Sequence, residues 1–277
     1  IQTNTIQTNT IQTNTIQTNT IQTTINLNEW ELVGIQSNEL SERTSVSLNN
    51  DGTKIVRGQI TYNLSRGKVS VNKYTEGNWY DNSGSQLTRI GSDISGLNAG
   101  ELAGWSCDIN ALGDRVIVGA PGFESYAGTA RVYNYSNNVW SQLGNDLSAN
   151  DLSNNAGWST AMNALGDVVV VGAPGFDSSA GTARVYQYLS DEWKQLGNVS
   201  DMSGNTDNFA GLSCDINGEG NVVVVGAPGT VDLYQGYAKV YDYNTTQSKW
   251  YQRRSKIFDL SDNSSKGYST AINSNGT

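Results

Sequence analysis

The residues most suggestive of chemistry are three glycine-rich turns that each follow a run of aliphatic residues. The turns read VGAPG and end at Gly122, Gly175 and Gly229. Such a turn can cradle a phosphate when a lysine and a helix N-terminus follow it. Here FESYAG, FDSSAG and TVDLYQG follow, with neither a lysine nor a helical pattern. Proline ends a strand because it has no N–H for the ladder, so we interpret these segments as structural turns.

Acidic residues are the other catalytic candidates, and they form no recognisable catalytic pattern. Asp114, Asp146, Asp151 and Asp167 recur in turns, where aspartate is favoured on conformational grounds. The chain has no histidine, which removes the commonest general base and the commonest metal ligand near neutral pH. We therefore predict that the protein is not an enzyme, and we assign no catalytic or cofactor-binding residue.

Charge and hydropathy restrict the partners. The formal net charge of −9 argues against nucleic acid, because phosphates would repel the chain and its densest basic run, Gln252–Lys256, is short. No apolar stretch approaches the roughly 20 residues that span a bilayer as a helix. The expected partners are a protein or glycan ligand, or other copies of the chain.

Residues 1–24 repeat the uncharged pentapeptide IQTNT. A period of five fits neither the two-residue period of a strand nor the 3.6-residue period of a helix. Three alternatives remain open: an extended polar stalk, a shaft that self-associates with other chains, and a low-complexity tail without fixed structure. Because the chain begins at Ile1, we interpret it as a processed or truncated product.

From about residue 25 the chain repeats at a longer period. Motifs of the form GxS recur at intervals of 53, 54 and 56 residues, and a divergent copy starts at Ser45. Repeats of about 40–50 residues that are rich in short β runs are typical of β-propeller blades. The four motifs are GWSCDIN at Gly104–Asn110, GWSTAMN at Gly157–Asn163, GLSCDIN at Gly211–Asn217 and GYSTAIN at Gly267–Asn273.

Each repeat divides into four predicted strands. In the clearest copy these are Trp158–Ala164, Val168–Gly172, Thr182–Tyr188 and Glu192–Leu196. The valine run is apolar on both faces, so we expect it to be buried on both. The fourth strand carries one tryptophan per repeat, which we expect to pack between adjacent blades. These tryptophans are Trp30, Trp79, Trp140, Trp193 and Trp250.

The sequence thus predicts an all-β propeller of four complete blades, at about 45–91, 106–144, 159–197 and 213–254. Partial blades are expected at 28–34 and 267–277, so the chain is interpreted as a fragment of a larger ring. The first-strand motif alternates between SCDIN and STAMN or STAIN, which indicates duplication of blade pairs. The alternation places Cys107 and Cys214 two blades apart, too far for a disulfide, and we expect both to be small buried side chains.

The segment AGWS…VVVVGAPG…AGTARVYQY at Ala156–Tyr188 resembles the FG-GAP repeat, and the resemblance extends over roughly residues 28–277. That family builds the propeller at the head of integrin alpha subunits, and many of its blades bind calcium between the first two strands. The resemblance therefore makes Asp215, Asn217 and Glu219, which offer alternating oxygen atoms, weak calcium candidates. Ca²⁺ needs six or more oxygen ligands, so we favour an ordinary hairpin and expect no metal site.

The sequence also contains six N-x-S/T sites, about the number expected by chance in so Asn-, Ser- and Thr-rich a chain. They permit N-glycosylation if the protein passes through a eukaryotic secretory route. The sites are Asn63, Asn134, Asn198, Asn244, Asn263 and Asn275.

Taken together, these features predict a non-catalytic propeller that is secreted or displayed on a cell surface and that acts by adhesion or protein–protein contact. The alternative is a structural subunit of an extracellular filament, appendage or viral fibre. In that alternative the IQTNT repeats form the shaft and the propeller decorates it. A third alternative, an enzyme whose active site lies in further blades, is disfavoured.

Overall fold

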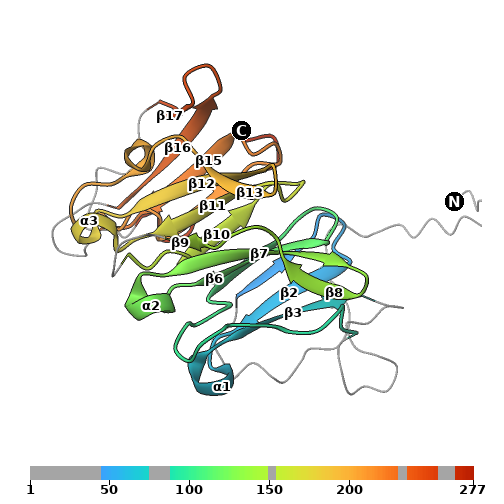
Figure 1. The fold of residues 1–277 in the computed structure, drawn as a ribbon. Coiled ribbons are helices and arrows are strands. Elements are labelled where there is room, and N and C mark those ends of the chain that lie inside the picture. The colour runs from blue at the N-terminus through green and yellow to red at the C-terminus, as the bar shows by residue number, and fades with distance from the viewer. Residues whose placement is uncertain (1–44, 75–87, 149–153, 230–235, 255–265) are drawn as a thin grey trace, which may run out of the picture. The chain divides into compact units, whose positions relative to one another are not determined.

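The computed structural model describes residues 45–74, 88–148, 154–229, 236–254 and 266–277 (Figure 1). The chain divides into two units, Ile1–Leu32 and Val33–Thr277, and all described residues belong to the second. The IQTNT tract, the predicted partial blade at 28–34, Trp30, Trp79 and Asn263 lie outside the described residues. The stalk and shaft hypotheses therefore stay predictions.

Four antiparallel sheets follow one another along the chain, and each has its strands in sequence order. We call them blades 1 to 4. Blade 1 contains β1 (Val46–Leu48), β2 (Lys54–Gln59), β3 (Lys68–Lys73) and β4 (Ile94–Ser95). Blade 2 contains β5 (Ser106–Ile109), β6 (Arg115–Ala120), β7 (Thr129–Ser136) and β8 (Val139–Gln142), with β9 (Leu147–Ser148) also paired to β7. Blade 3 contains β10 (Ser159–Met162), β11 (Val168–Ala173), β12 (Thr182–Leu189) and β13 (Glu192–Leu196), and blade 4 contains β14 (Ser213–Ile216), β15 (Val222–Ala227), β16 (Tyr237–Asn244) and β17 (Lys249–Gln252).

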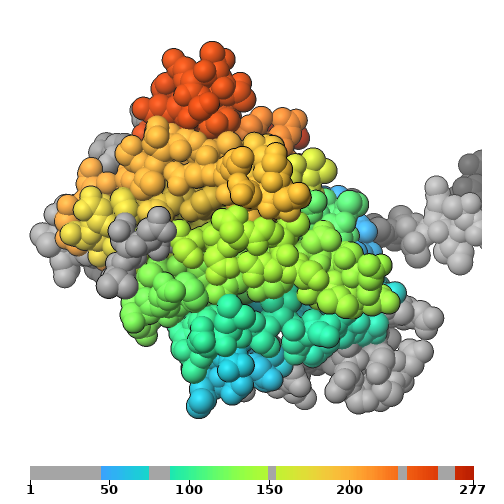
Figure 2. All heavy atoms as spheres, viewed as in Figure 1, coloured from blue at the N-terminus to red at the C-terminus, as the bar shows by residue number. Residues whose placement is uncertain are grey.

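The core lies between successive blades. Every residue of β11 and β15 is buried, which confirms that the valine runs are covered on both faces. One cluster joins Val168 and Val185 of blade 3 to Val223 and Val225 of blade 4. Figure 2 shows the atoms of successive blades in contact along the chain's colour order. Burial of these faces is the main favourable term that holds neighbouring blades together.

The fourth-strand tryptophans join neighbouring blades as predicted. Each indole is buried and donates its N–H to a main-chain carbonyl of the preceding blade, while a tyrosine of the adjacent third strand packs on the ring. The donors and acceptors are Trp140 and Ile90 at 2.8 Å, Trp193 and Leu143 at 2.7 Å, and Trp250 and Leu196 at 3.0 Å. The tyrosines are Tyr135, Tyr188 and Tyr243, with ring centroids 5.0, 5.2 and 5.0 Å from the indoles.

Two short strands lie beyond the predicted blade ends, β4 beyond residue 91 in blade 1 and β9 beyond residue 144 in blade 2. In blade 1 the strand that pairs with the start of β3 is β4, which lies beyond the predicted end of the blade at residue 91. It matches β9, because Ile94 pairs with Val69 as Leu147 pairs with Ala130. The strand predicted in the partial blade at 267–277 is wrong as a strand, since residues 266–277 contain no assigned strand.

The segment 266–277 nevertheless occupies the place of a first strand. Thr270 donates from its hydroxyl to Ser213 Oγ at 3.1 Å, and the Ile272 N–H donates to Asp215 Oδ2 at 2.8 Å. Blade 3 makes the same two bonds to blade 2, from Thr160 to Ser106 at 3.0 Å and from Met162 to Asp108 at 2.8 Å.

These bonds give the alternating motif a structural basis. The aspartate of each SCDIN strand accepts a main-chain N–H from the next blade, and the alanine of each STAMN-type strand cannot. The cysteines of the SCDIN strands are free and buried, with a serine hydroxyl of the preceding blade 3.0 Å from each sulfur. Their burial as free thiols confirms the prediction that Cys107 and Cys214 are small, buried, unpaired side chains, and that burial raises the pKa of each to about 12.

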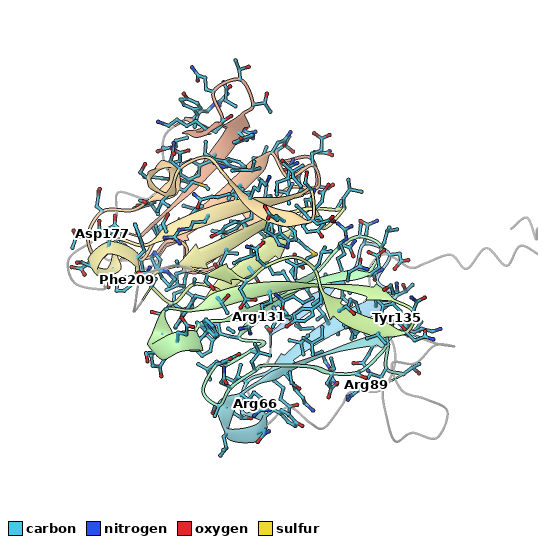
Figure 3. The ribbon with its side chains drawn as sticks, viewed as in Figure 1. Arg66, Arg89, Arg131, Tyr135, Asp177 and Phe209 are labelled. Carbon is cyan, nitrogen blue, oxygen red and sulfur yellow. The ribbon has the colours of Figure 1, made fainter. Side chains whose placement is uncertain are left out.

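In blades 1 to 3, the connections between the second and third strands lie on one side of the blades. They contain the short turns α1 (Tyr62–Ser65), α2 (Phe123–Tyr126) and α3 (Phe176–Ser179). Tyr135, next to the β7–β8 turn, lies at the opposite end from Asp177 of α3 (Figure 3). Each turn holds non-glycine residues at positive φ, such as Asp177 at 46° and Ser178 at 55°. Such conformations cost about 1–3 kcal/mol each and cluster at functional sites.

Main-chain bonds fix each of these turns to the segment that enters the next blade. The bonds run from Leu102 N to Ser65 O at 3.0 Å, from Asn155 N to Tyr126 O at 2.9 Å and from Phe209 N to Ser179 O at 2.9 Å. This side of the blades is therefore a row of similar, rigidly connected loops. None of the helices in the described ranges has the length and apolar character needed to cross a membrane.

Candidate functional site

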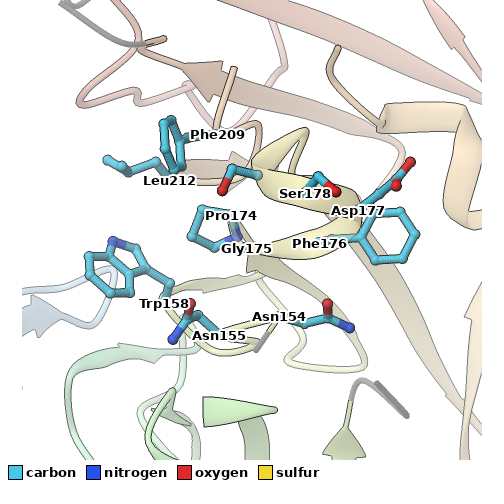
Figure 4. Close-up of a pocket in the computed structure, with 11 residues that line it drawn as sticks. Asn154, Asn155, Trp158, Pro174, Gly175, Phe176, Asp177, Ser178, Phe209 and Leu212 are labelled. Carbon is cyan, nitrogen blue, oxygen red and sulfur yellow. The ribbon is translucent and has the colours of Figure 1, made fainter. Parts of the chain in front are cut away.

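A pocket of about 800 Å³ opens on the α3 side, over the junction of blades 3 and 4 (Figure 4). Three segments that are far apart in the sequence form it. They are the segment that enters blade 3, the turn from β11 into α3, and the segment that enters blade 4. The lining residues are Asn154, Asn155 and Trp158 from the first, Pro174–Ser179 from the second, and Phe209 and Leu212 from the third.

Aromatic and aliphatic side chains form most of the pocket wall. Figure 4 shows Trp158 at one end, Phe176 at the other, and Phe209 with Leu212 along the side opposite Asn155. The main chain holds them in place, since Trp158 N donates to Asn155 O and Leu212 N donates to Phe209 O, both at 3.1 Å. The Trp158 ring also packs on Trp105, with centroids 4.6 Å apart. Fixed aromatic faces of this kind suit sugar rings and apolar side chains.

One polar group in the pocket is buried without a partner. Asn154 is 3% exposed, and its side-chain Nδ2 makes no hydrogen bond. Its main-chain carbonyl accepts from Gly175 N at 3.1 Å, so the residue is held in position. A buried donor without an acceptor is unfavourable by about 1–3 kcal/mol. A ligand oxygen in this pocket would remove that cost.

A buried cation lies behind Phe176. The guanidinium carbon of Arg184 is 5.2 Å from the centroid of the Phe176 ring, and the residue is 9% exposed. Its Nε has no hydrogen-bond partner. Burial raises the pKa of Tyr186, and the Arg184 charge together with a hydrogen bond between the two side chains opposes that rise. Asn154 therefore lines the pocket itself, whereas Arg184 contacts the Phe176 ring and does not line the pocket.

The calcium candidates lie in a different place, around the β14–β15 hairpin. Asp215 accepts from the N–H groups of Ile216 and Ile272, both at 2.8 Å. Asn217 Oδ1 accepts from Asn221 N at 3.0 Å and from Val222 N. Glu219 accepts from Asn221 Nδ2 at 3.2 Å. These bonds use the candidate oxygens to close the hairpin and to join the next segment. Across the described ranges, no cluster of three or more His, Cys, Asp or Glu side chains could hold a metal ion.

Asn217 and Glu219 also line a smaller polar hollow of about 400 Å³, together with Asn221, Asn275 and the Asp242–Arg253 ion pair. Asp215 does not line this hollow.

Most of the sequons lie at the surface. Asn63, Asn198, Asn244 and Asn275 are exposed, whereas Asn134 is partly buried within β7. The amide oxygen of Asn244 accepts from Gln247 N at 3.0 Å. Exposure makes four of the sites accessible to a glycosyltransferase, and it does not test whether they are used.

Asp108 is the acidic group most perturbed by its surroundings. Burial raises the pKa of its carboxyl to about 6, although hydrogen bonds from Ser47 Oγ and from the N–H groups of Met162 and Ile109 favour the charged form. The carboxyl spans the junctions of blade 2 with both of its neighbours. It lies in the inner first strand and does not line the pocket.

We expect the raised pKa of Asp108 to make stability depend on pH. The folded protein retains this proton to higher pH than the unfolded chain, whose carboxyl has a pKa near 3.8. The free energy of unfolding should therefore fall as the pH rises from about 4 to about 6, by up to ~3 kcal/mol for a shift of about two pKa units. Urea unfolding of the wild type and of Asp108→Asn across this range measures the difference.

Asp51 supplies the control, because hydrogen bonds from the Thr53 side chain and main chain lower its pKa. The stability difference between wild type and Asp51→Asn should stay nearly constant from about pH 4 to 6, and the stability that Asp51 contributes should be lost only as the pH falls below about 4. If the wild type and Asp108→Asn keep a constant difference across the range, the raised pKa of Asp108 is refuted.

The pocket was not predicted from the sequence. Its walls come from residues about 20 and 55 positions apart, and the loops that carry them read as ordinary polar turns. The sequence feature that could have pointed to the pocket is a difference between two repeats at one equivalent position. The residue three before the GxS glycine is Glu101 in blade 2 but Asn154 in blade 3.

Comparison with known proteins supports the fold. No family model matches the sequence, and no curated protein matches it either. Among solved structures, hydrazine synthase of Kuenenia stuttgartiensis is similar with a TM-score of 0.53 at 10% identity, over 84% of this chain and 59% of that chain. TolB from Acinetobacter baumannii has a TM-score of 0.44 at 14% identity, over 74% of this chain and 42% of that chain. A protein from Lactobacillus plantarum has a TM-score of 0.48 at 15% identity, over 80% of this chain and 56% of that chain.

This chain therefore spans well under two thirds of each of these structures. The likeness bears on the fold alone. With the four successive four-stranded sheets, the chain has an all-β, propeller-type fold. Membership of the FG-GAP family stays a prediction, because no family model matches.

Proposed function

We propose that this propeller is a non-catalytic binding module, secreted or displayed on a cell surface, and that it holds a protein or glycan ligand in the pocket of blades 3 and 4. The observation that carries the proposal is a fixed pocket with aromatic walls and an unpartnered buried amide. A preformed, mostly apolar pocket with a few convergent polar groups is the usual form of a binding site.

Three further features support the proposal. The pocket has no histidine, because the chain contains none, and the cysteines lie buried in the inner strands with strongly raised pKa values. Four sequons are exposed, so they could accept a glycan if the chain passes through a eukaryotic secretory pathway. The valine–Gly-Ala-Pro-Gly repeats support a divergent relation to FG-GAP propellers.

The test is a binding screen of the purified protein against glycan and protein arrays, followed by Trp158→Ala. We expect this variant to weaken the affinity for any ligand found by at least tenfold, because truncation of a tryptophan hot spot costs about 2 kcal/mol or more and each 1.4 kcal/mol is tenfold. Tyr251→Ala is the matched control, since Tyr251 is an exposed aromatic residue on β17 and does not line the pocket. Equal losses in both variants, or a ligand whose affinity neither changes, would refute the pocket as the binding site.

A further inference from the structure

We propose that the pocket of blades 3 and 4 recognises a carboxylate carried on a sugar ring, as in a hexuronate. This inference rests on the proposed function and specifies its ligand. It comes from a comparison of two blades of the same chain. A buried arginine has carboxylate partners in one blade, and in the other blade it has none among the residues that the structure describes.

Arg131 and Arg184 occupy equivalent positions. Arg131 of β7 pairs in register with Val118 of β6, and Arg184 of β12 pairs with Val171 of β11. Both guanidinium groups lie over the phenylalanine that opens the adjacent turn, at 5.0 Å for Phe123 and 5.2 Å for Phe176. The same cation–aromatic arrangement is therefore built twice.

In blade 2 the cation is neutralised within the chain. Arg131 Nη1 is 3.1 Å from Glu101 Oε2, and Arg131 Nε is 2.8 Å from Asp146 Oδ2. Although burial alone lowers the pKa of Arg131, Asp146 and Glu101 raise it overall. A buried guanidinium needs such partners, because an uncompensated charge in the interior is strongly unfavourable.

In blade 3 both carboxylates are missing from the corresponding places. Asn154 stands where Glu101 stands, since the two main-chain carbonyls accept from the equivalent Gly175 and Gly122 N–H groups, both at 3.1 Å. Asn154 is neutral, and its side chain lines the pocket.

The counterpart of Asp146 in blade 3, Asp201, does not pair with Arg184. Asp201 precedes the buried Met202 as Asp146 precedes the buried Leu147. The extra turn η1 (Val199–Met202) instead directs Asp201 to the N–H groups of Asn198 at 3.0 Å and Trp250 at 3.1 Å. Within the part of the chain that the structure describes, no carboxylate forms an ion pair with Arg184.

At the position of the Glu101 carboxylate, blade 3 has Asn154 Nδ2, a donor. Blade 3 therefore has two donor groups, Arg184 and Asn154, where blade 2 has a donor and an acceptor. A carboxylate accepts hydrogen bonds at two oxygens and matches both a guanidinium and an amide NH₂ group. A ligand carboxylate seated beside Asn154 would occupy the place of the Glu101 carboxylate and neutralise Arg184.

The rest of the pocket favours a sugar over an acidic peptide as the carrier. Trp158 and Phe209 offer aromatic faces, and Asn155 and Ser178 offer groups that can bond hydroxyls. Asp177 at the rim and the net charge of −9 would repel a segment with several carboxylates. A single carboxylate on a ring avoids most of that repulsion.

The experiment is an NMR titration of the whole chain with glucuronate, with its neutral counterpart glucose, and with a short peptide of glycine and aspartate. We expect glucuronate to bind at least tenfold more tightly than glucose, with shifts at Trp158 and Asn154. Arg184→Met should remove this preference. Asn154→Glu should abolish glucuronate binding, because the new carboxylate would pair with Arg184 as Glu101 pairs with Arg131.

Asn154→Glu also has a readout independent of any ligand, because an internal pair with Arg184 should raise the melting temperature. Thr206→Glu, which adds the same charge on an exposed loop residue, should not raise it. A lowered melting temperature in Asn154→Glu, equal binding of glucose and glucuronate, or binding of the peptide alone would each overturn the inference. Binding of neutral glycans that depends on Trp158 would refute the carboxylate and leave the proposed function standing, whereas no binding of any probe or array ligand would refute both.

Discussion

Gly172→Ala is expected to lower the free energy of unfolding by about 3 kcal/mol, because the added methyl group would force blades 3 and 4 apart. Gly172 lies in β11, and a Cβ built on it would fall well inside the contact distance of the Gly211 carbonyl oxygen. That oxygen belongs to the main chain and accepts a hydrogen bond from Ser159 Oγ at 2.8 Å. It therefore cannot move aside without breaking the contact between the two blades.

The same close approach occurs at every junction in the described residues. Gly58, Gly119 and Gly226 face the carbonyls of Gly104, Gly157 and Gly267 in the same way. Gly218→Ala is the matched control, because its Cβ would meet mainly the Ser274 hydroxyl, a side-chain group that can rotate. Chemical denaturation of the two variants tests the prediction. Similar losses in both, or no loss in Gly172→Ala, would contradict it.

Glu101→Gln is expected to be as damaging, at about 3–5 kcal/mol, because it removes one partner of a buried ion pair. Glu101 is 2% exposed and Arg131 is 3% exposed. Besides Arg131, the carboxylate accepts from the N–H groups of Leu97 and Asn98, both at 2.9 Å, and from Asn98 Nδ2 at 2.8 Å. Glutamine offers one acceptor oxygen and an NH₂ group, so some of these donors and Arg131 would face another donor.

Asp93→Asn is the control for Glu101→Gln. Asp93 pairs with Arg89 and Lys68 near the surface, where an ion pair is worth about 0–1 kcal/mol. Urea unfolding of both variants at one pH separates the two cases. If the loss in Glu101→Gln does not exceed that in Asp93→Asn, the buried triad of Glu101, Arg131 and Asp146 does not stabilise blade 2 as the geometry implies.

Much of the fold could be predicted from the sequence because the repeat supplies several views of one blade. The valine runs and the fourth-strand tryptophans recur at fixed positions, and side chains that recur so regularly usually pack in the repeated core. Strand bounds in blade 3 were therefore predicted to within a few residues. The prediction missed β4 and β9, which lie beyond the predicted blade ends, and it expected a strand at 267–277 where none is assigned.

The candidate site was harder to predict because it depends on differences between repeats. Asn154, Phe176 and Phe209 read as loop residues, and only the packed blades bring them around one pocket. The positive φ values of Asp177 and Ser178 carry no glycine signal, since their conformation comes from the surrounding loop. That Arg184 lacks a carboxylate partner could be recognised only once the structure had shown that Glu101 contacts Arg131.

The alternation of first strands also makes the junction beneath the pocket different from its neighbours. At the other junctions an aspartate of an inner strand accepts a bond across the boundary, as Asp108 and Asp215 do. Between blades 3 and 4, Ala161 stands in place of that aspartate. Among the described side chains of β10, Ser159 is the one that bonds the first strand of blade 4 and the segment before it, at Cys214 Sγ and the Gly211 carbonyl. A ligand that contacts Trp158 on blade 3 and Phe209 on the segment entering blade 4 would add contacts across this junction, which has few hydrogen bonds between its first strands. Ligand binding would then raise the force needed to separate blades 1–3 from blade 4 when the chain is pulled.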